Sequence, residues 1–341
     1  MKSKFLKYNT DKVELWLFVS MLLVAAMIIL GGATRLTNSG LSITEWAPIK
    51  GILPPLNNQS WVSEFEKYKL IPEFLAEHSD MDLSGFKTIY FWEWSHRQLG
   101  RIIGLVYAIP LIIFIISKKI QKEKIFNFVG VLLLICMQGI IGWWMVSSGL
   151  ENDRIDVSQY RLATHLGVAF IILACLFWLW KNQKERWPEI SKKNSLTRYT
   201  KILTLLVYLQ IILGAFVAGL KAGRTYNTWP LMDGDFVPRG YMRLDPYWKN
   251  IFENISAVQF NHRTLAYIIV LLTIWVFIIS KNNKKVRRAL IGFKLLLLVQ
   301  VSLGVFVILT VDVLWLALVH QFSAIILWLS IVNITRLARI K

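Results

Sequence analysis

The chain has 341 residues, 55% of them apolar, and a formal net charge of +18. Its apolar runs are too long for a soluble core of ordinary proportions, so the composition excludes an ordinary soluble domain and predicts a polytopic membrane protein. The basic excess would also suit a nucleic-acid partner, but its distribution along the chain indicates membrane topology instead.

Eight stretches are long and apolar enough to cross a bilayer as helices. In chain order they are expected at about residues 15–33, 98–117, 126–146, 162–180, 202–220, 260–280, 290–310 and 313–334. A long outer segment, residues 34–92, follows the first of them. In that segment we expect one amphipathic helix from Glu64 to Glu77 at the interface, and an aromatic belt that includes Trp61, Trp92 and Trp94.

The distribution of Lys and Arg predicts that both termini lie inside. The inner segments would then hold 24 of the 39 basic and 5 of the 21 acidic residues, and they are 1–14, 117–125, 181–201, 281–294 and 335–341. Cytoplasmic loops carry such an excess of Lys and Arg. The short N-terminal segment lacks the features of a cleaved signal peptide or an Arg-rich transit peptide. We therefore expect a bacterial inner (plasma) membrane, with the mitochondrial inner membrane as the alternative.

Landmarks recur in the two halves of the sequence. A His-Arg pair opens the second span of each half and a Gln-x-x-x-Gly motif lies in the third: His96-Arg97 with His262-Arg263, and Gln138 and Gly142 with Gln300 and Gly304. Such repetition predicts an all-α integral membrane protein made of two pseudo-symmetric four-helix bundles, residues 1–200 and 201–341. Three glutamines are expected to link helices by hydrogen bonds, namely Gln138, Gln210 and Gln300.

Four histidines lie near the outer ends of the even-numbered spans: His96, His165, His262 and His320. A small residue follows each of them one helical turn later: Gly100, Ala169, Ala266 and Ala324. Residues i and i+4 share a helix face, so each imidazole has room beside it for a flat macrocycle. Two imidazoles from facing helices saturate a haem iron and favour electron transfer. We predict one bis-histidine haem site in each half; a zinc site is disfavoured because the histidines divide between two bundles.

The two halves differ three positions before their first histidine, where Glu93 stands in one and Gln259 in the other. The side chains are near isosteres, but only the carboxylate can take up a proton or stabilise a developing cation. This difference predicts a reactive site in the N-terminal half and an electron-transfer site in the C-terminal half. The sequence allows equally that Glu93 is an interfacial residue paired with Arg97 or Arg101.

Basic residues near the outer ends of spans are candidates for binding haem propionates: Arg35, Arg97, Lys221, Arg224 and Arg263. Each of them could equally be an interfacial anchor that extends towards the headgroups. The fifth histidine, His78, lies between Glu77 and Asp80 and is expected to be a solvated surface residue.

These motifs resemble those of the haem A synthase family over nearly the whole chain. The matching segments are residues 31–37 with 39–42, 93–97, 164–167, 259–264 and 319–321. One branch of that family carries a cysteine pair in its outer loops. Both cysteines here, Cys136 and Cys175, fall within predicted spans, where we expect small buried residues, so the chain resembles the cysteine-free branch of mitochondrial and some bacterial members.

The resemblance implies that His96 and His165 flank a substrate haem O and that His262 and His320 ligate a resident haem B. It also implies that Glu93 is the functional glutamate of a Glu-x-x-His motif. The reaction would oxidise a methyl group of haem O to a formyl group by successive hydroxylations, giving haem A for cytochrome oxidase. Haem O synthase and an electron donor are the implied partners besides the lipid bilayer, and a homo-oligomer is left open.

Two other functions fit the same histidines. One is a dihaem b-type membrane electron-transfer cytochrome, which would carry out no chemistry on its macrocycles. The other is a haem carrier, whose haem would exchange readily and need no electron supply. The resemblance makes haem A synthase the leading hypothesis, and changing Glu93 to Gln separates it from the cytochrome.

Overall fold

The computed structural model describes residues 10–47, 49–150, 154–189, 195–311 and 313–340. Within these ranges it contains helices and one isolated β-bridge but no strand, which confirms the all-α class. Eight of the described helices are long and apolar enough to cross a membrane. They are α1 (Thr10–Leu36), α4 (Leu83–Ile116), α5 (Ile125–Leu150), α6 (Gln159–Lys184), α7 (Ser195–Gly219), α9 (Ile255–Ile279), α10 (Lys284–Leu309) and α11 (Leu314–Leu337).

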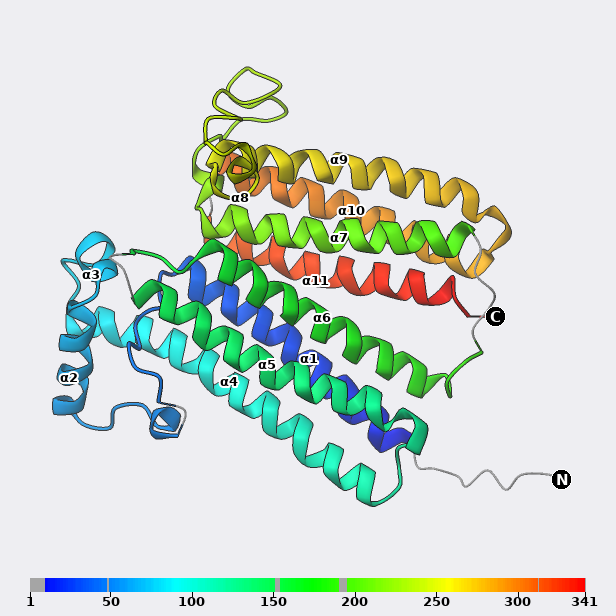
Figure 1. The fold of residues 1–341 in the computed structure, drawn as a ribbon, viewed down its shortest axis with the longest axis horizontal. Coiled ribbons are helices and arrows are strands. Elements are labelled where there is room, and N and C mark those ends of the chain that lie inside the picture. The colour runs from blue at the N-terminus through cyan, green and yellow to red at the C-terminus, as the bar shows by residue number, and fades with distance from the viewer. Residues whose placement is uncertain (1–9, 48, 151–153, 190–194, 312, 341) are drawn as a thin grey trace.

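Each long helix contains one of the eight predicted spans, to within one residue at the ends. In Figure 1, α1, α4, α5 and α6 lie together and α7, α9, α10 and α11 lie together beside them. The division at residue 200, the pseudo-symmetry of the halves and the placement of both termini inside stay predictions. Residues 1–9 and 341, which belong to the predicted inner segments, lie outside the described residues.

The eight helices form an inner and an outer set. α6 packs against α1, α5, α7 and α11, and α11 packs against α1, α6, α7 and α10. Half of the most apolar window of α6 is buried, against 11% of that window in α5 and in α10. An apolar helix with so little buried surface suits contact with lipid. The contacts therefore place α1, α6, α7 and α11 at the centre, while the other four helices turn most of their apolar side chains outward.

The segment between α1 and α4 folds into an outer cap, which we define as residues 38–82 with the first turns of α4. It contains η1 (Lys50–Ile52), α2 (Asn58–Lys69) and α3 (Pro72–Glu77). The single helix predicted from Glu64 to Glu77 is wrong. Pro72 begins a new helix, and the residue before it, Ile71, is extended at φ −90° and ψ 150°. Proline disfavours the helical conformation in the preceding residue, so the chain breaks there.

The outer cap has a small apolar core of its own. Trp61 is 8% exposed and packs edge to face against Tyr90 and Phe86. Its predicted place in an aromatic belt is therefore wrong, because the cap supplies aromatic partners that shield it from the interface. Trp92, at 38% exposed, is accessible as expected of a belt residue.

Helix α4 is much longer than its predicted span. Its 34 residues correspond to about 51 Å at 1.5 Å per residue, whereas a hydrocarbon core is about 30 Å thick. The extra turns at its start pack against the cap through Phe86, Ile89 and Tyr90. Glu93 and His96 consequently lie where the cap meets the helix bundle. The second connection of this kind, between α7 and α9, contains η3 (Ala222–Arg224), η4 (Tyr247–Lys249) and α8 (Asn250–Glu253).

At the opposite end of the bundle, a buried arginine ties α11 to α6. Arg336 is fully buried, donates to Asn182 Oδ1 at 2.9 Å and pairs with Glu185 Oε2 at 2.7 Å. Of the two cysteines, Cys175 is partly buried, but Cys136 is exposed on α5, so the expectation that it is buried is wrong. The outward face of α5 explains this exposure.

Candidate functional site

Each of the four helical histidines faces a glycine on a neighbouring helix. A Cβ built on these glycines would stand 2.9–3.2 Å from the imidazole, closer than side chains normally approach. The pairs are His96 with Gly31 of α1, His165 with Gly142 of α5, His262 with Gly214 of α7 and His320 with Gly304 of α10. Glycine is therefore the residue that lets each ring lie against the adjacent backbone.

Three of the four rings are also held by a glutamine one turn before the facing glycine. Gln138 Nε2 lies 3.2 and 3.4 Å from the two ring nitrogens of His165 and donates to its backbone carbonyl at 2.9 Å. Gln210 repeats the arrangement on His262 with distances of 3.2, 3.3 and 2.9 Å. Gln300 Nε2 lies 3.3 and 3.2 Å from the ring nitrogens of His320.

The nearly equal distances have a geometric meaning. A neutral imidazole has one nitrogen with an in-plane lone pair and one with an N–H, and these two directions diverge in the ring plane, so one amide group cannot point along both. The glutamine therefore lies against the ring and leaves an in-plane lone pair for another partner. Among the described residues, the Oε1 atoms of these three glutamines are buried without a hydrogen-bond partner. Buried polar atoms in native proteins are nearly always satisfied, so each site fits a bound polar or metal-containing group.

The histidines are brought together in pairs. The side chains of His96 and His165 lie within electrostatic range of each other, and so do those of His262 and His320. The residue pairs are those expected from the sequence, one in each set of four helices. Each pair offers two imidazole side chains from different helices, and two imidazoles suit the axial positions of a haem iron.

Glu93 is buried beside the first pair, with 2% of its surface exposed. Its Oε1 accepts from Arg97 at 2.6 and 3.0 Å, and its Oε2 accepts from the Ser42 hydroxyl at 2.8 Å and the Ile43 amide at 2.7 Å. Charge-assisted bonds of this length are among the stronger ones in proteins. Arg97 in turn donates to the carbonyl oxygens of Ile43 and Glu45 at 2.9 and 3.0 Å. Glu93 thus fixes residues 42–45 beside His96.

The second pair has an equivalent corner, by which we mean the side chain three residues before the first histidine together with the loop that it holds. This corner has an amide in place of the carboxylate. Gln259, with 1% of its surface exposed, donates to the carbonyl of Tyr226 at 3.1 Å. Arg263 donates to the same carbonyl at 2.8 Å and to that of Thr228 at 2.9 Å. A loop is fastened to the helix in both corners, but only the first corner holds a buried carboxylate beside its histidine.

A family model described as cytochrome oxidase assembly protein matches residues 14–332. The Heme A synthase of Maricaulis maris is 46% identical over 333 residues, which cover 96% of each chain. That of Beijerinckia indica is 44% identical and covers 97% of this chain and 94% of its own, and that of Paracoccus denitrificans is 42% identical with 96% and 88%. The chain belongs to the haem A synthase family.

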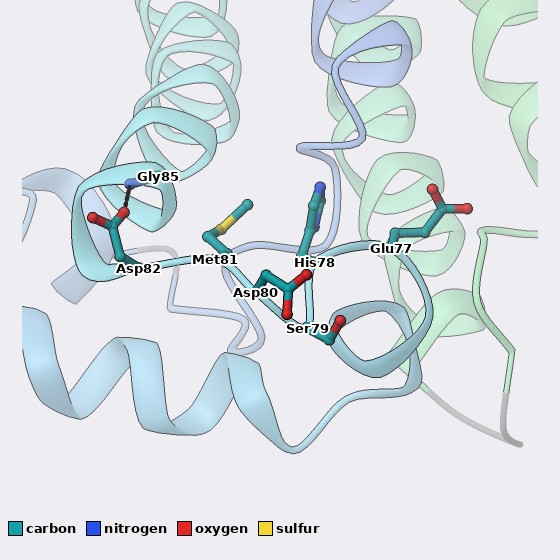
Figure 2. A pocket seen from close by; sticks show the side chains of 7 residues that line it. All are labelled: Glu77, His78, Ser79, Asp80, Met81, Asp82 and Gly85. Carbon is teal, nitrogen blue, oxygen red and sulfur yellow. Dashed lines mark hydrogen bonds between the residues drawn. The ribbon is translucent and has the colours of Figure 1, made fainter.

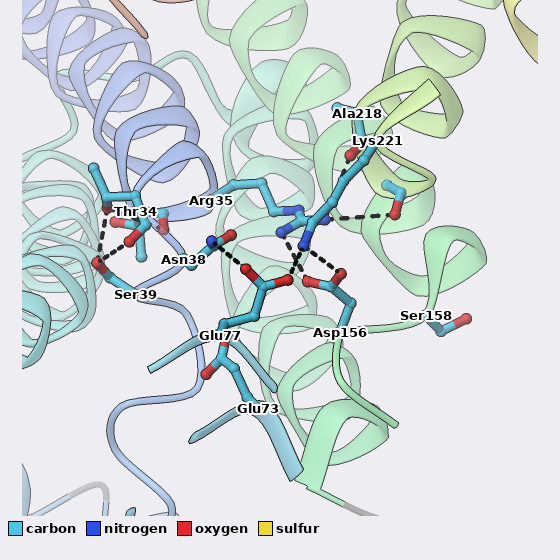
Figure 3. A network of polar contacts seen from close by, with 12 residues as sticks. Thr34, Arg35, Asn38, Ser39, Glu73, Glu77, Asp156, Ser158, Ala218 and Lys221 are labelled. Carbon is cyan, nitrogen blue, oxygen red and sulfur yellow. Dashed lines mark hydrogen bonds and ion pairs between the residues drawn. The ribbon is translucent and has the colours of Figure 1, made fainter. Parts of the chain in front are cut away.

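The predicted propionate-binding residues of this family member lie in different surroundings. Arg35 pairs with Asp156 at 2.9 Å, and Lys221 pairs with Asp156 at 3.0 Å and with Glu77 at 2.9 Å. Figure 3 shows these side chains converging from α1, α3, the loop before α6 and the end of α7. Arg35 and Lys221 therefore already have carboxylate partners. Arg97 pairs with Glu93, Arg263 binds the carbonyls described above, and Arg224 is exposed in η3.

The expectation that His78 is a solvated surface residue is wrong. It is half-buried, and its Nδ1 lies 2.6 Å from the hydroxyl of Tyr68, which donates to Glu73 Oε2 at 3.2 Å. Burial lowers the pKa of His78 and raises the pKa of Glu73 to about 8. No local pattern indicated this cluster, because Tyr68, Glu73 and His78 lie five residues apart, a spacing that does not place side chains on one face of a helix.

A pocket opens beside this cluster on the outer cap (Figure 2). It is lined by residues 77–82 and Gly85, and none of the four helical histidines borders it. Asp82 faces the start of α4, where its carboxylate accepts from the Gly85 amide at 2.8 Å and caps the helix. This pocket therefore belongs to the outer cap and is separate from the two histidine pairs.

Proposed function

We propose that this chain is a haem A synthase that oxidises a methyl group of haem O to a formyl group by successive hydroxylations. The N-terminal half would hold haem O and the C-terminal half a resident haem B. One difference between the two corners carries the proposal. The N-terminal corner has Glu93 at the position where the C-terminal corner has Gln259. Only the carboxylate can take up a proton or stabilise a developing cation, which suits a site that changes its substrate.

The donor sets suit the groups assigned to them. His262 and His320 would hold haem B, which when bound supplies one-electron transfer, and His96 and His165 would flank the iron of haem O. For the propionates we propose Arg35, Arg97, Lys221, Arg224 and Arg263. Two of these have a buried Nε without a partner in the described part of the chain, Arg35 and Arg263. A propionate oxygen would satisfy such a donor.

Glu93 would act in two ways. It holds Arg97 and residues 42–45 in one position, so the edge of the substrate site is preorganised before the macrocycle arrives. Its buried negative charge would also stabilise positive charge that develops beside the ring as the methyl group is oxidised. Charge stabilisation of this kind is strong where water is excluded.

The chain is a multi-pass membrane protein, and we propose the bacterial plasma membrane as its location with the haem sites towards the outer side. Bacterial relatives and the distribution of basic residues support this choice. Haem O is apolar apart from its propionates, so delivery through the bilayer by haem O synthase suits the lipid-facing helices. An electron donor must supply the C-terminal haem B.

The test is mass spectrometry of extracted haems after co-expression with haem O synthase in a host that makes no haem A. Wild type should yield haem A or hydroxylated haem O together with haem B. The variant Glu93→Gln should keep haem B and lose at least most of the oxidised product. Haem B alone from correctly folded wild type supplied with electrons would instead identify a dihaem electron-transfer cytochrome.

A matched control is Gln259→Glu, which places a carboxylate in the other corner beside Arg263. It should leave the conversion of haem O intact, because that corner belongs to the resident site. If Glu93→Gln made as much haem A as wild type, the role assigned to Glu93 would be wrong. Unchanged haem B in both variants would show that the fold survives the substitutions.

A further inference from the structure

One of the four histidines lacks the glutamine that holds the other three. The Gln-x-x-x-Gly pattern places Gln138, Gln210 and Gln300 one turn before the facing glycine. On α1 the glycine is Gly31, and the residue four positions before it is Met27. Within the described part of the chain, the His96 ring has no hydrogen bond.

A second residue changes together with this methionine. One turn after the histidine, the other three helices carry Ala169, Ala266 and Ala324, while α4 carries Gly100. The Met27 methyl lies 3.5 Å from where a Cβ of Gly100 would stand. The end of the Met27 side chain therefore lies against α4 beside Gly100, one turn after His96, whereas the glutamines of the other sites contact their histidine rings.

The two side chains restrain an imidazole very differently. The amides of Gln138 and Gln210 contact the ring and donate to the backbone carbonyl of the same histidine, so they couple the ring to its helix. A thioether has no donor, and methionine has three flexible bonds that adapt to a moving neighbour. His96 is consequently the least restrained of the four rings.

We propose that Met27 makes His96 the displaceable iron ligand of the substrate site, while Gln138 keeps His165 as the retained ligand. This inference rests on the proposed function, in which the N-terminal half takes up haem O and releases haem A at every turnover. A site with two restrained ligands would hold its haem as the resident site does. Met27 is a positioning residue, because it acts through His96.

Carbon monoxide is a suitable probe, since it binds a ferrous haem only when one axial ligand leaves. In purified protein with both haems bound, CO should bind the N-terminal haem first. Met27→Gln should slow that binding about fivefold, the size of one added hydrogen bond. The matched exchange Gln210→Met should speed CO binding to the resident haem B by a similar factor. The double variant Met27→Gln with Gly100→Ala reproduces the Gln210 and Ala266 pair of the resident site. It controls for poor packing of the new amide beside a glycine.

Met27→Leu separates restraint from packing. A leucine fills similar space and donates no hydrogen bond, so CO binding should stay within about twofold of wild type. Equal slowing by leucine and glutamine would overturn the proposal, because packing alone would then explain the effect. Unchanged CO binding in both Met27→Gln and Gln210→Met would overturn it as well.

The identity of the displaced ligand can be tested independently. His96→Ala should retain an N-terminal haem that is five-coordinate and binds CO rapidly, whereas His165→Ala should lose that haem. The reverse result would overturn the assignment. If wild type and both variants contained only the C-terminal haem, the N-terminal half would hold no haem and the proposed function itself would fail. A bound haem with equal behaviour of both variants would refute only the role of Met27.

Discussion

The two halves of the molecule surround a pair of histidines in a similar way, but they differ at three positions around the first histidine of each pair. Where the C-terminal half has Gln210, Gln259 and Ala266, the N-terminal half has Met27, Glu93 and Gly100. The shared frame is a ring against a glycine and a loop fastened to the helix by an arginine. The differences add a charge and remove a restraint. Under the proposed function, similar surroundings would thus provide one site that retains its haem and one that exchanges and oxidises it.

The largest expected effect comes from removing a ligand of the retained site. His262→Ala should abolish six-coordinate haem B and lower thermal stability, because a cofactor bound only to the folded state stabilises it and the proposed haem B would join α9 to α11. The absorption spectrum of the purified variant measures this directly. His96→Ala serves as the control and should keep the full haem B signal. Retention of six-coordinate haem B in His262→Ala would refute the assignment of the C-terminal pair.

A smaller effect should follow from filling the space beside one ring. Gly304→Ala would place a Cβ 3.0 Å from the His320 ring, so the imidazole must shift and haem B occupancy should fall by roughly half or more. Gly292→Ala on the same helix meets no atom within 4 Å and should leave occupancy unchanged. The haem-to-protein ratio of the two variants checks the prediction. Equal ratios would show that the close approach of ring and backbone is unimportant.

The smallest effect concerns the outer cap, which only the N-terminal half possesses in this form. The folded pKa of Glu73, about 8, lies above its ordinary value of 4.5, so the folded cap binds a proton that the unfolded chain releases. Its contribution to stability is complete below pH 4.5 and is lost as the pH rises towards 8. Hydrogen exchange of residues 58–77 should therefore be faster at pH 8 than at pH 5, beyond the intrinsic pH dependence of exchange. Glu73→Gln should remove that excess; an identical excess in the variant would contradict the prediction.

Much of the fold could be predicted because long apolar helices leave a strong signal in the sequence. The eight helices followed from hydropathy, and a common face followed from a histidine and a small residue at i and i+4. The outer cap was harder. Pro72 divided the expected helix, and Trp61 found aromatic partners that lie more than 20 residues away in the sequence. Such contacts depend on tertiary packing and have no local pattern.

The site was foreseen unevenly for the same reason. The pairing of histidines and the Glu93 to Gln259 difference could be read from the two repeats. The partners of Arg35 and Lys221 could not, because these ion pairs join residues that lie 121 and 144 positions apart in the sequence. The expected hydrogen bonds of Gln138 and Gln210 between helices are confirmed, but the contact of the glutamines with the histidine rings was not predicted. Their shared spacing before a glycine was the available signal, but only the structure shows which ring each glycine faces.

The two halves are joined at both ends of the bundle. Arg336 connects α11 to Asn182 and Glu185 at one end, and Asp156 connects Arg35 to Lys221 at the other. Between these ends the inner helices pack directly against one another. The gap between the two histidine pairs is therefore set by rigid packing rather than by a hinge. An electron that passes from one half to the other would cross a fixed thickness of protein, so its rate would be insensitive to the viscosity of the surrounding solution.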